Sequence, residues 1–183
     1  MRLPSFLSRF ARDSRGFVNV EAVIVFPALL FLFGVGWTYF DAFRQQAVNQ
    51  KANYVIGDML SRETEAITPD YLTNARHLLR HLTKTGGADS DLRITIVQYS
   101  DSYGGWRVSW SQQRGDYPSL SDADMPAYAD KLPSGVNGEQ LILVETWDSY
   151  SPVFSVGLDA FEIRTYSFTR PRYAPQVVFE QPA

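Results

Sequence analysis

The chain has 183 residues, of which 45% are hydrophobic, with 17 basic residues, 20 acidic residues and no cysteine. This length fits one domain of ordinary size with a small appendage, large enough to bury a core without a disulfide or metal. The lack of cysteine excludes thiol nucleophiles, disulfides and thiolate metal sites. The net charge of −3 excludes a generally basic nucleic-acid binder, so we expect no nucleic-acid partner.

The charge is unevenly distributed along the chain. Residues 1–16 carry four arginines, Arg2, Arg9, Arg12 and Arg15, against a single acid. The rest of the chain has 13 basic and 19 acidic residues, a net charge of −6. A basic head on an acidic body suggests that the two ends lie in different surroundings.

A long apolar run follows the basic head. The 24 residues from Phe17 to Phe40 contain one charged side chain, Glu21. As a helix they would extend about 36 Å, enough to cross a hydrocarbon core of about 30 Å. Because the arginines come first, we expect residues 1–16 inside and the chain after residue 41 outside. These features predict a single-pass protein of the inner (cytoplasmic) membrane, in contact with the lipid bilayer. Bulky aromatic residues end the run, which argues against signal-peptide cleavage there.

Glu21 is the most informative residue of the run. A carboxylate in a membrane helix costs on the order of 3 kcal/mol at the bilayer centre and is usually retained because it has a partner. On the membrane side, no basic residue lies within helical reach of Glu21. An ordinary signal anchor with a chance glutamate remains the alternative interpretation.

The string Arg15–Glu21 (RGFVNVE) resembles the processing site of type IV prepilins, a basic leader ending in glycine, then phenylalanine, then glutamate as the fifth mature residue. The longer string DSRGFVNVEA, followed by FPALL, is similar to TadE/TadF-like minor pseudopilins of tight-adherence (Flp, type IVb) pili. The resemblance implies that a prepilin peptidase cuts between Gly16 and Phe17. It also implies that Glu21 acts as the assembly carboxylate, pairing with the new α-ammonium of a neighbouring subunit.

This resemblance predicts a non-enzymatic structural protein whose partners are the prepilin peptidase, other pilins and the pilus assembly machinery. About 140 residues follow the apolar run, which favours a minor subunit over a bulk filament protein. The alternative is a signal-anchored envelope binding or sensor module that is never cleaved. An envelope enzyme ranks third, because the sequence shows no catalytic set and no nucleotide-binding glycine loop.

After the apolar run, residues 41–66 predict a helical stalk without proline. Phe40, Phe43, Ala47 and Tyr54 share one narrow stripe, which we expect to pack against the globular part. Within the span, Pro27, Gly34 and Gly36 either weaken the helix or are simply tolerated there.

A second helix has clear boundary signals. Thr68 is a candidate N-cap, Pro69 suits the first turn, and the pair Gly86 and Gly87 ends the region. Its apolar residues recur at helical spacing: Tyr71, Leu72, Ala75, Leu78, Leu79 and Leu82. This stripe predicts a helix with one face in the core.

Four strands are predicted at residues 92–99, 106–112, 140–150 and 161–170, the first two joined as a hairpin by residues 101–105. A short helix is expected near residues 121–132. The predicted fold is α+β: a long N-terminal transmembrane and stalk helix, a second helix, and a mostly antiparallel sheet of about four strands. The expected organisation is leader 1–16, transmembrane helix 17–40, stalk 41–66 and exported α+β domain 67–183.

The exported part contains a few candidate ligands. His77 and His81 stand four apart but on the face opposite the apolar stripe, so we expect exposed side chains and no metal site or cofactor. Two D-x-D pairs, Asp89/Asp91 and Asp122/Asp124, do not continue into a calcium-loop pattern. We interpret Arg170 and Arg172 as a solvated strand end rather than as an anion-binding site. Four aromatic residues either line a binding face or pack in the core: Tyr99, Tyr103, Trp106 and Trp110.

Overall fold

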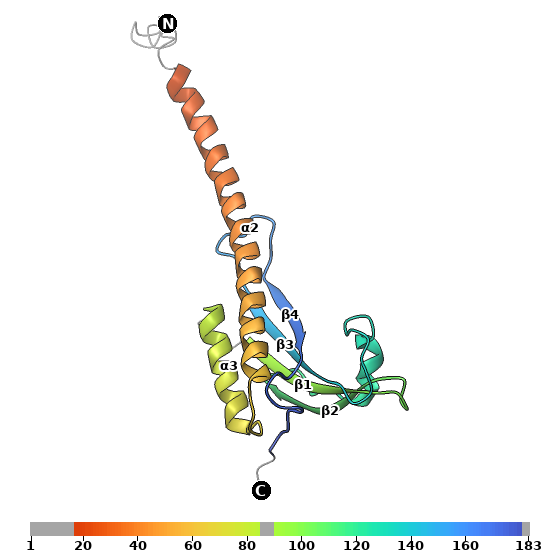
Figure 1. Cartoon of the computed structure of the whole chain (residues 1–183). Helices are drawn as coiled ribbons and strands as arrows, with labels where there is room; N and C mark the ends of the chain where they lie inside the picture. The colour runs from red at the N-terminus through yellow and green to blue at the C-terminus, as the bar shows by residue number, and fades with distance from the viewer. Residues whose placement is uncertain (1–16, 85–89, 181–183) are drawn as a thin grey trace, which may run out of the picture. The chain divides into compact units, whose positions relative to one another are not determined.

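A computed structural model describes residues 17–84 and 90–180. Its elements, in chain order, are α2 (Phe17–Ser61), α3 (Pro69–Thr83), β1 (Ser90–Ser100), β2 (Gly105–Arg114), the 3₁₀ helix η2 (Asp122–Tyr128), β3 (Gln140–Tyr150) and β4 (Phe161–Thr169) (Figure 1). The predicted α+β class, with a long N-terminal helix, a second helix and four antiparallel strands, is therefore confirmed.

The chain divides into two compact units. The first contains α2 up to Asp41 together with Pro152–Leu158. Within it, α2 continues through Pro27, whose missing N–H costs one helical hydrogen bond. Thr38 is buried, and its hydroxyl donates to the Gly34 carbonyl oxygen at 2.9 Å. The helix is thus unbroken at the proline and glycine positions that could have weakened it.

The second unit comprises Ala42–Ser151 and the chain from Asp159 onward. Its sheet has the strand order β2-β1-β3-β4, and every neighbouring pair is antiparallel. The predicted hairpin joins β1 and β2, and Gly104 takes a φ of +75° in its turn, a conformation that favours glycine. β1 and β3 are the inner strands, so their sequences are apolar along most of their length.

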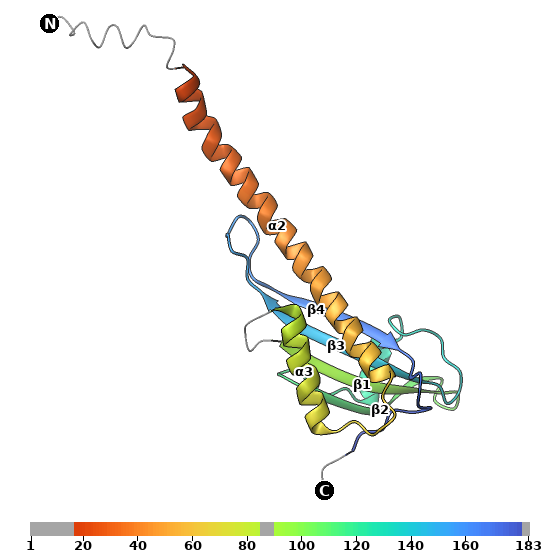
Figure 2. The same cartoon turned by 60° about the vertical axis from the view of Figure 1, so that its left-hand side comes forward.

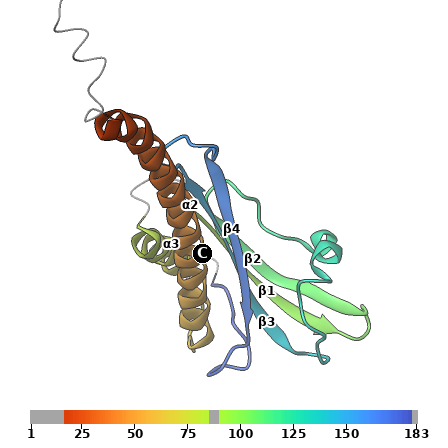
Figure 3. The same ribbon diagram turned by 90° about the horizontal axis from the view of Figure 1, so that it is seen from above.

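One face of this sheet is covered by helices (Figure 3). Residues 42–61 of α2 and the whole of α3 pack there, and the main core lies between them and the inner strands. Its largest fully buried side chains are Ile56, Leu60, Ile67, Leu72, Leu79, Leu92, Ile94, Ile96 and Ile142. The C-terminal segment closes this core through a parallel bridge between Ile67 and Phe179.

The opposite face carries a smaller core under the segment that links β2 and β3 (Figure 3). Met125, Tyr128 and Leu132 pack there on Val97, Leu141 and Leu143. The predicted helix near residues 121–132 is shorter than expected and is a 3₁₀ helix, η2. Pro126 lies inside it and cannot donate a backbone hydrogen bond, which disfavours a longer α-helix.

α3 lies against the helix-covered face of the sheet (Figure 2), and it follows its sequence signals closely. The Thr68 side chain accepts a hydrogen bond from the Tyr71 N–H at 3.2 Å, which confirms the predicted N-cap. The predicted stripe faces the core, with Leu72, Ala75 and Leu79 buried. The glycine pair expected to end the region lies outside the described residues.

The predicted stripe on the stalk was wrong. Phe43 and Tyr54 are 68% and 55% exposed, and Ala47 is also exposed. The helix instead buries a stripe of small, polar and aliphatic residues, Ala42, Asn49, Ala52, Asn53, Ile56 and Leu60. Asn53 explains this choice, because it donates to the Val144 carbonyl oxygen at 3.1 Å and to the Thr146 hydroxyl at 3.3 Å, and accepts from Ser167. Hydrogen bonds to the sheet therefore decide which face of α2 is buried.

The pairing of β1 with β2 contains a bulge. A register shift between Ile96 and Val97 of β1 pairs Val97 with Val108, but Ile96 with Trp110. This bulge places Trp106 and Val108 in the smaller core and Trp110 beside the main core. In a regular strand the even spacing of these residues would place all three on one face, and the bulge moves Trp110 to the other face.

Candidate functional site

The predicted processing motif lies at the start of α2. Gly16 lies outside the described residues, and Phe17 is the first residue of the helix. Glu21 is exposed one turn further along. Within residues 17–84 and 90–180, we find no hydrogen bond or ion pair to the Glu21 carboxylate.

The helix around Glu21 is apolar on all sides. Val35 is half-buried, whereas thirteen large hydrophobic side chains of α2 in the first unit are between 40% and 73% exposed: Val20, Val23, Ile24, Val25, Phe26, Leu29, Leu30, Phe31, Leu32, Phe33, Trp37, Tyr39 and Phe40. By length and composition, α2 could cross a membrane, and no part of its most apolar stretch is buried within the protein. A helix that is hydrophobic all round is stable only when lipid or other helices cover it.

The chemistry of this site is electrostatic. A carboxylate that enters a medium of low dielectric constant either takes up a proton or pairs with a cation. The residues one turn from Glu21 are apolar on both sides, Phe17 and Val18 before it and Ile24 and Val25 after it. A cation supplied by another chain would therefore satisfy Glu21 without breaking any contact among the described residues.

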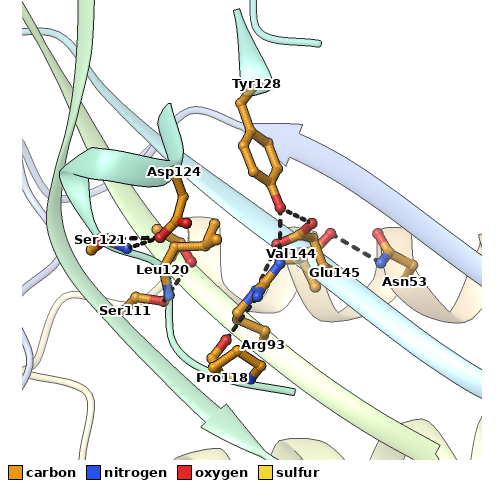
Figure 4. A network of polar contacts seen from close by, with 11 residues as sticks. Asn53, Arg93, Ser111, Pro118, Leu120, Ser121, Asp124, Tyr128, Val144 and Glu145 are labelled. Atoms are coloured by element: carbon orange, nitrogen blue, oxygen red, sulfur yellow. Dashed lines mark hydrogen bonds and ion pairs between the residues drawn. The ribbon is translucent and has the colours of Figure 1, made fainter. Parts of the chain in front are cut away.

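A buried ion pair lies in the second unit, and the sequence did not predict it (Figure 4). Arg93 and Glu145 are each 6% exposed and face each other across β1 and β3. The guanidinium donates to Glu145 Oε2 from Nε at 2.8 Å and to the Pro118 carbonyl oxygen at 2.7 Å. It also donates to the Tyr128 hydroxyl at 2.8 Å, which in turn donates to Glu145 Oε1 at 2.8 Å.

This network ties the β2–β3 linker to the sheet. Burial, followed by the hydrogen bond to Glu145, raises the pKa of Tyr128 well above its ordinary value. Arg93 also lies over the Trp147 ring at 4.9 Å, and Trp147 stacks on Tyr117 at 4.1 Å. A sequence signal exists, because each charge is the single ionisable residue within an apolar stretch of its strand. The sequence does not show how β1 and β3 align, so it does not show that Arg93 lies opposite Glu145.

An aromatic pocket of about 440 Å³ lies beside the β1–β2 turn. Tyr99, Tyr103 and Trp106 line it, so three of the four aromatic residues left open by the sequence share one site. Trp110 does not belong to this pocket, because its ring packs on Phe179 and its Nε1 donates to the Val177 carbonyl oxygen at 2.8 Å.

The acidic pairs have structural partners. Asp91 pairs with Arg76 at 3.2 Å and accepts from the Asp116 N–H, whereas Asp89 lies outside the described residues. Asp122 accepts from Arg107 and from the Val108 N–H, contacts that lower the pKa of its carboxyl. Hydrogen bonds from Ser121 at the start of η2 likewise lower the pKa of Asp124.

The remaining candidates are on the surface. His77 and His81 are exposed, as expected, and the described residues contain no group of three metal-ligating side chains. Arg170 pairs with Glu139 at 2.5 Å, and Arg172 with Asp58 at 3.2 Å, while both guanidinium groups stay exposed. No family model, curated protein or solved structure matches this chain.

Proposed function

We propose that this chain is a pseudopilin-like structural protein for the biogenesis of tight-adherence (Flp, type IVb) pili. The resemblance of residues 9–45 to TadE/TadF-like minor pseudopilins motivates the proposal. The observation that carries it is Glu21, an exposed carboxylate one turn into an apolar helix that could cross a membrane. Glu21 has no partner among the described residues, so an assembly partner is the simplest source of one.

In this proposal the precursor inserts into the inner membrane with residues 1–16 in the cytoplasm and the exported domain outside. A prepilin peptidase then cuts the bond between Gly16 and Phe17 and creates an α-ammonium at Phe17. During assembly, Glu21 of one subunit neutralises that ammonium on its neighbour. Pairing removes the cost of two buried, unpaired charges, and it fixes the axial stagger between adjacent helices.

The apolar surface of α2 has two successive roles. Before assembly, lipid covers the exposed side chains between Val20 and Phe40. After assembly, neighbouring helices replace the lipid. Because the chain is structural in this proposal, it needs no cofactor and no catalytic residue. The peptidase, the other pilins and the assembly machinery are its partners.

Processing is tested by intact mass and N-terminal sequencing of the protein from native membranes, with and without the prepilin peptidase. We expect the chain to start at Phe17 only when the peptidase is present. Gly16→Ala should block cleavage, whereas the matched control Ser14→Ala should be cleaved normally. A chain that starts at Met1 in both strains would contradict the proposal.

The role of Glu21 is tested by Glu21→Gln, which removes the charge at constant size. We expect normal cleavage after Gly16 but loss of the subunit from the pilus assembly. Asp41→Asn, a carboxylate at the far end of the apolar stretch, is the control and should assemble. Normal assembly of Glu21→Gln would show that the carboxylate is not the assembly group.

The second candidate function is a signal-anchored envelope binding module that is never cleaved. The aromatic pocket beside the β1–β2 turn favours it, because a preformed concave site is typical of ligand binding. The same N-terminal sequencing separates the two functions, since this module would keep Met1 in the presence of the peptidase.

A further inference from the structure

Half of the residues that line the aromatic pocket beside the β1–β2 turn carry rings. Its volume is about 440 Å³, within the range of sites that hold a ligand or a peptide anchor. Its walls include four aromatic and two proline residues, namely Tyr99, Tyr103, Trp106, Tyr128, Pro126 and Pro133. It lies wholly within the second unit, and the proposed assembly helix does not contribute to it.

The walls are held in place by specific contacts. The Tyr128 hydroxyl is fixed by the buried Arg93–Glu145 pair (Figure 4). Trp106 Nε1 donates to the Pro133 carbonyl oxygen at 2.8 Å, and its ring meets the Tyr99 ring edge-on at 5.3 Å. Gly135 closes against both rings, since a Cβ there would lie 2.6 Å from Tyr99 Cδ2. The pocket is therefore preformed, which lowers the entropic cost of binding.

The polar groups of the lining narrow the class of ligand. The side chains that line the pocket include three hydroxyl-bearing residues that the buried pair does not hold, Tyr99, Tyr103 and Ser134. The lining contains no carboxylate, amide or guanidinium side chain. A saccharide would leave most of its hydroxyls without partners there, and each unpaired buried polar group is costly. Proline rings suit such a surface, because proline-rich segments dock into aromatic-lined grooves in an extended conformation.

The charge beside the pocket favours a basic ligand. Asp101 and Asp130 are exposed, are close in sequence to lining residues, and make no ion pair with the described residues. Two cations lie nearby: Arg107 is neutralised by Asp122 at 2.8 Å, and the Lys131 ammonium lies over the Tyr128 ring at 4.6 Å. With Asp122, the two unpaired carboxylates make three acidic side chains against two basic ones, so this rim carries a net charge of −1.

We propose that this pocket docks a basic, proline-containing extended segment of a partner protein. Proline rings would pack against the rings of Tyr103, Tyr99 and Pro126, while arginine or lysine side chains of the segment would pair with Asp101 and Asp130. The site goes beyond the proposed assembly function and does not depend on it. Docking requires neither cleavage after Gly16 nor the Glu21 carboxylate.

The test uses the full-length chain in detergent micelles and a synthetic nonapeptide of three Pro-Pro-Arg repeats. Binding is followed by tryptophan fluorescence, because Trp106 lies in the wall. We expect saturable binding and about tenfold weaker affinity for Tyr103→Ala, the scale of removing one aromatic anchor. Tyr103 is 53% exposed, so its truncation should not unfold the domain. Tyr173→Ala, 69% exposed and outside the pocket, is the matched control and should bind normally.

Two further peptides separate ring packing from charge. Three Ala-Ala-Arg repeats keep the charge and should bind about tenfold more weakly, and three Pro-Pro-Glu repeats keep the rings and should also bind weakly. The proposal is overturned if the Pro-Pro-Arg peptide does not bind, or if Tyr103→Ala binds it as well as the unmodified chain. Equal binding of Ala-Ala-Arg repeats, or displacement of the peptide by a cello-oligosaccharide, would also overturn it. None of these results bears on cleavage, so failure here and failure of the assembly proposal are distinguishable.

Discussion

Glu21 and Glu145 are the same residue type in two regions with opposite packing. Glu145 is 6% exposed and is bonded by Arg93 and Tyr128 from elsewhere in its own unit. Glu21 is exposed on an apolar helix and has no partner among the described residues. Both occupy sequences that are otherwise apolar, so the sequence context alone does not separate them.

The two glutamates differ in their counter-charge: Arg93 supplies it for Glu145, and no described residue supplies it for Glu21. In the second unit, Arg93, Glu145 and Asn53 meet partners brought by the fold. Three buried oxygen atoms there, Asn49 Oδ1, Gln113 Oε1 and Asp148 Oδ2, have no hydrogen-bond partner among the described residues. The first unit leaves a carboxylate and a large apolar surface uncovered. Such a surface requires lipid or neighbouring helices to cover it, which is why the proposed assembly function is assigned to the first unit.

The largest expected effect comes from breaking the buried pair. Glu145→Ala leaves Arg93 charged and buried without its carboxylate, which should lower the free energy of unfolding by about 3–5 kcal/mol. Urea unfolding of the full chain in detergent micelles measures this loss of unfolding free energy. The control Glu162→Ala removes an exposed carboxylate paired with Arg164 and should change stability little. A small loss for Glu145→Ala would mean that water reaches Arg93.

The second-largest loss of unfolding free energy should come from removing the polar contact between α2 and the sheet. Asn53→Ala removes the amide that bonds the Val144 carbonyl oxygen and the Ser167 hydroxyl, at a cost of about 1–3 kcal/mol. Asn74→Ala is the matched control, because it makes the same change on an exposed position of α3. Equal stability of the two variants would contradict the hydrogen-bonded account of the buried stripe.

A smaller effect is expected at alkaline pH. Folding raises the pKa of Tyr128, so the phenol is deprotonated in the unfolded chain, above about pH 10, before it is in the folded one. Its contribution to stability is full below pH 10 and falls as the pH rises towards the folded pKa. The stability difference between the unmodified chain and Tyr128→Phe should therefore shrink between pH 9 and 11. A constant difference over that range of urea titrations would contradict the raised pKa.

The smallest effects on folding should come from the exposed surface of α2. Phe43→Ala should change the unfolding free energy by less than about 0.5 kcal/mol, because the ring is 68% exposed. Ile56→Ala, on the buried side of the same helix, should cost about 2–5 kcal/mol. Glu21→Gln should also leave folding unchanged while abolishing assembly. A clear loss of stability in Phe43→Ala would instead support the sequence-based prediction that Phe43 packs against the globular part.

Much of the fold was predictable because its signals are local. The α3 stripe follows from helical spacing, and the Thr68 cap and the hairpin at residues 101–105 follow from cap and turn residues. The strands follow from short runs rich in β-branched and aromatic residues. The missed features are not local. A bulge moves Trp110 to the other face of the sheet, and no sequence pattern within β2 predicts this bulge. The stripe of Phe40, Phe43, Ala47 and Tyr54 on α2 was predicted to face the core because it is apolar. Apolar character was the only criterion that the sequence offered there.

The sequence by itself determined the order of elements, the apolar helix with its lone carboxylate, and the motif that predicts processing after Gly16. Each depends on residues close together in the chain, where steric and hydrophobic preferences act directly. Only the tertiary structure decided which face of α2 is buried, that Arg93 meets Glu145, and that three aromatic residues form one pocket. These depend on register and on hydrogen bonds between distant segments, which exist only once the strands have paired.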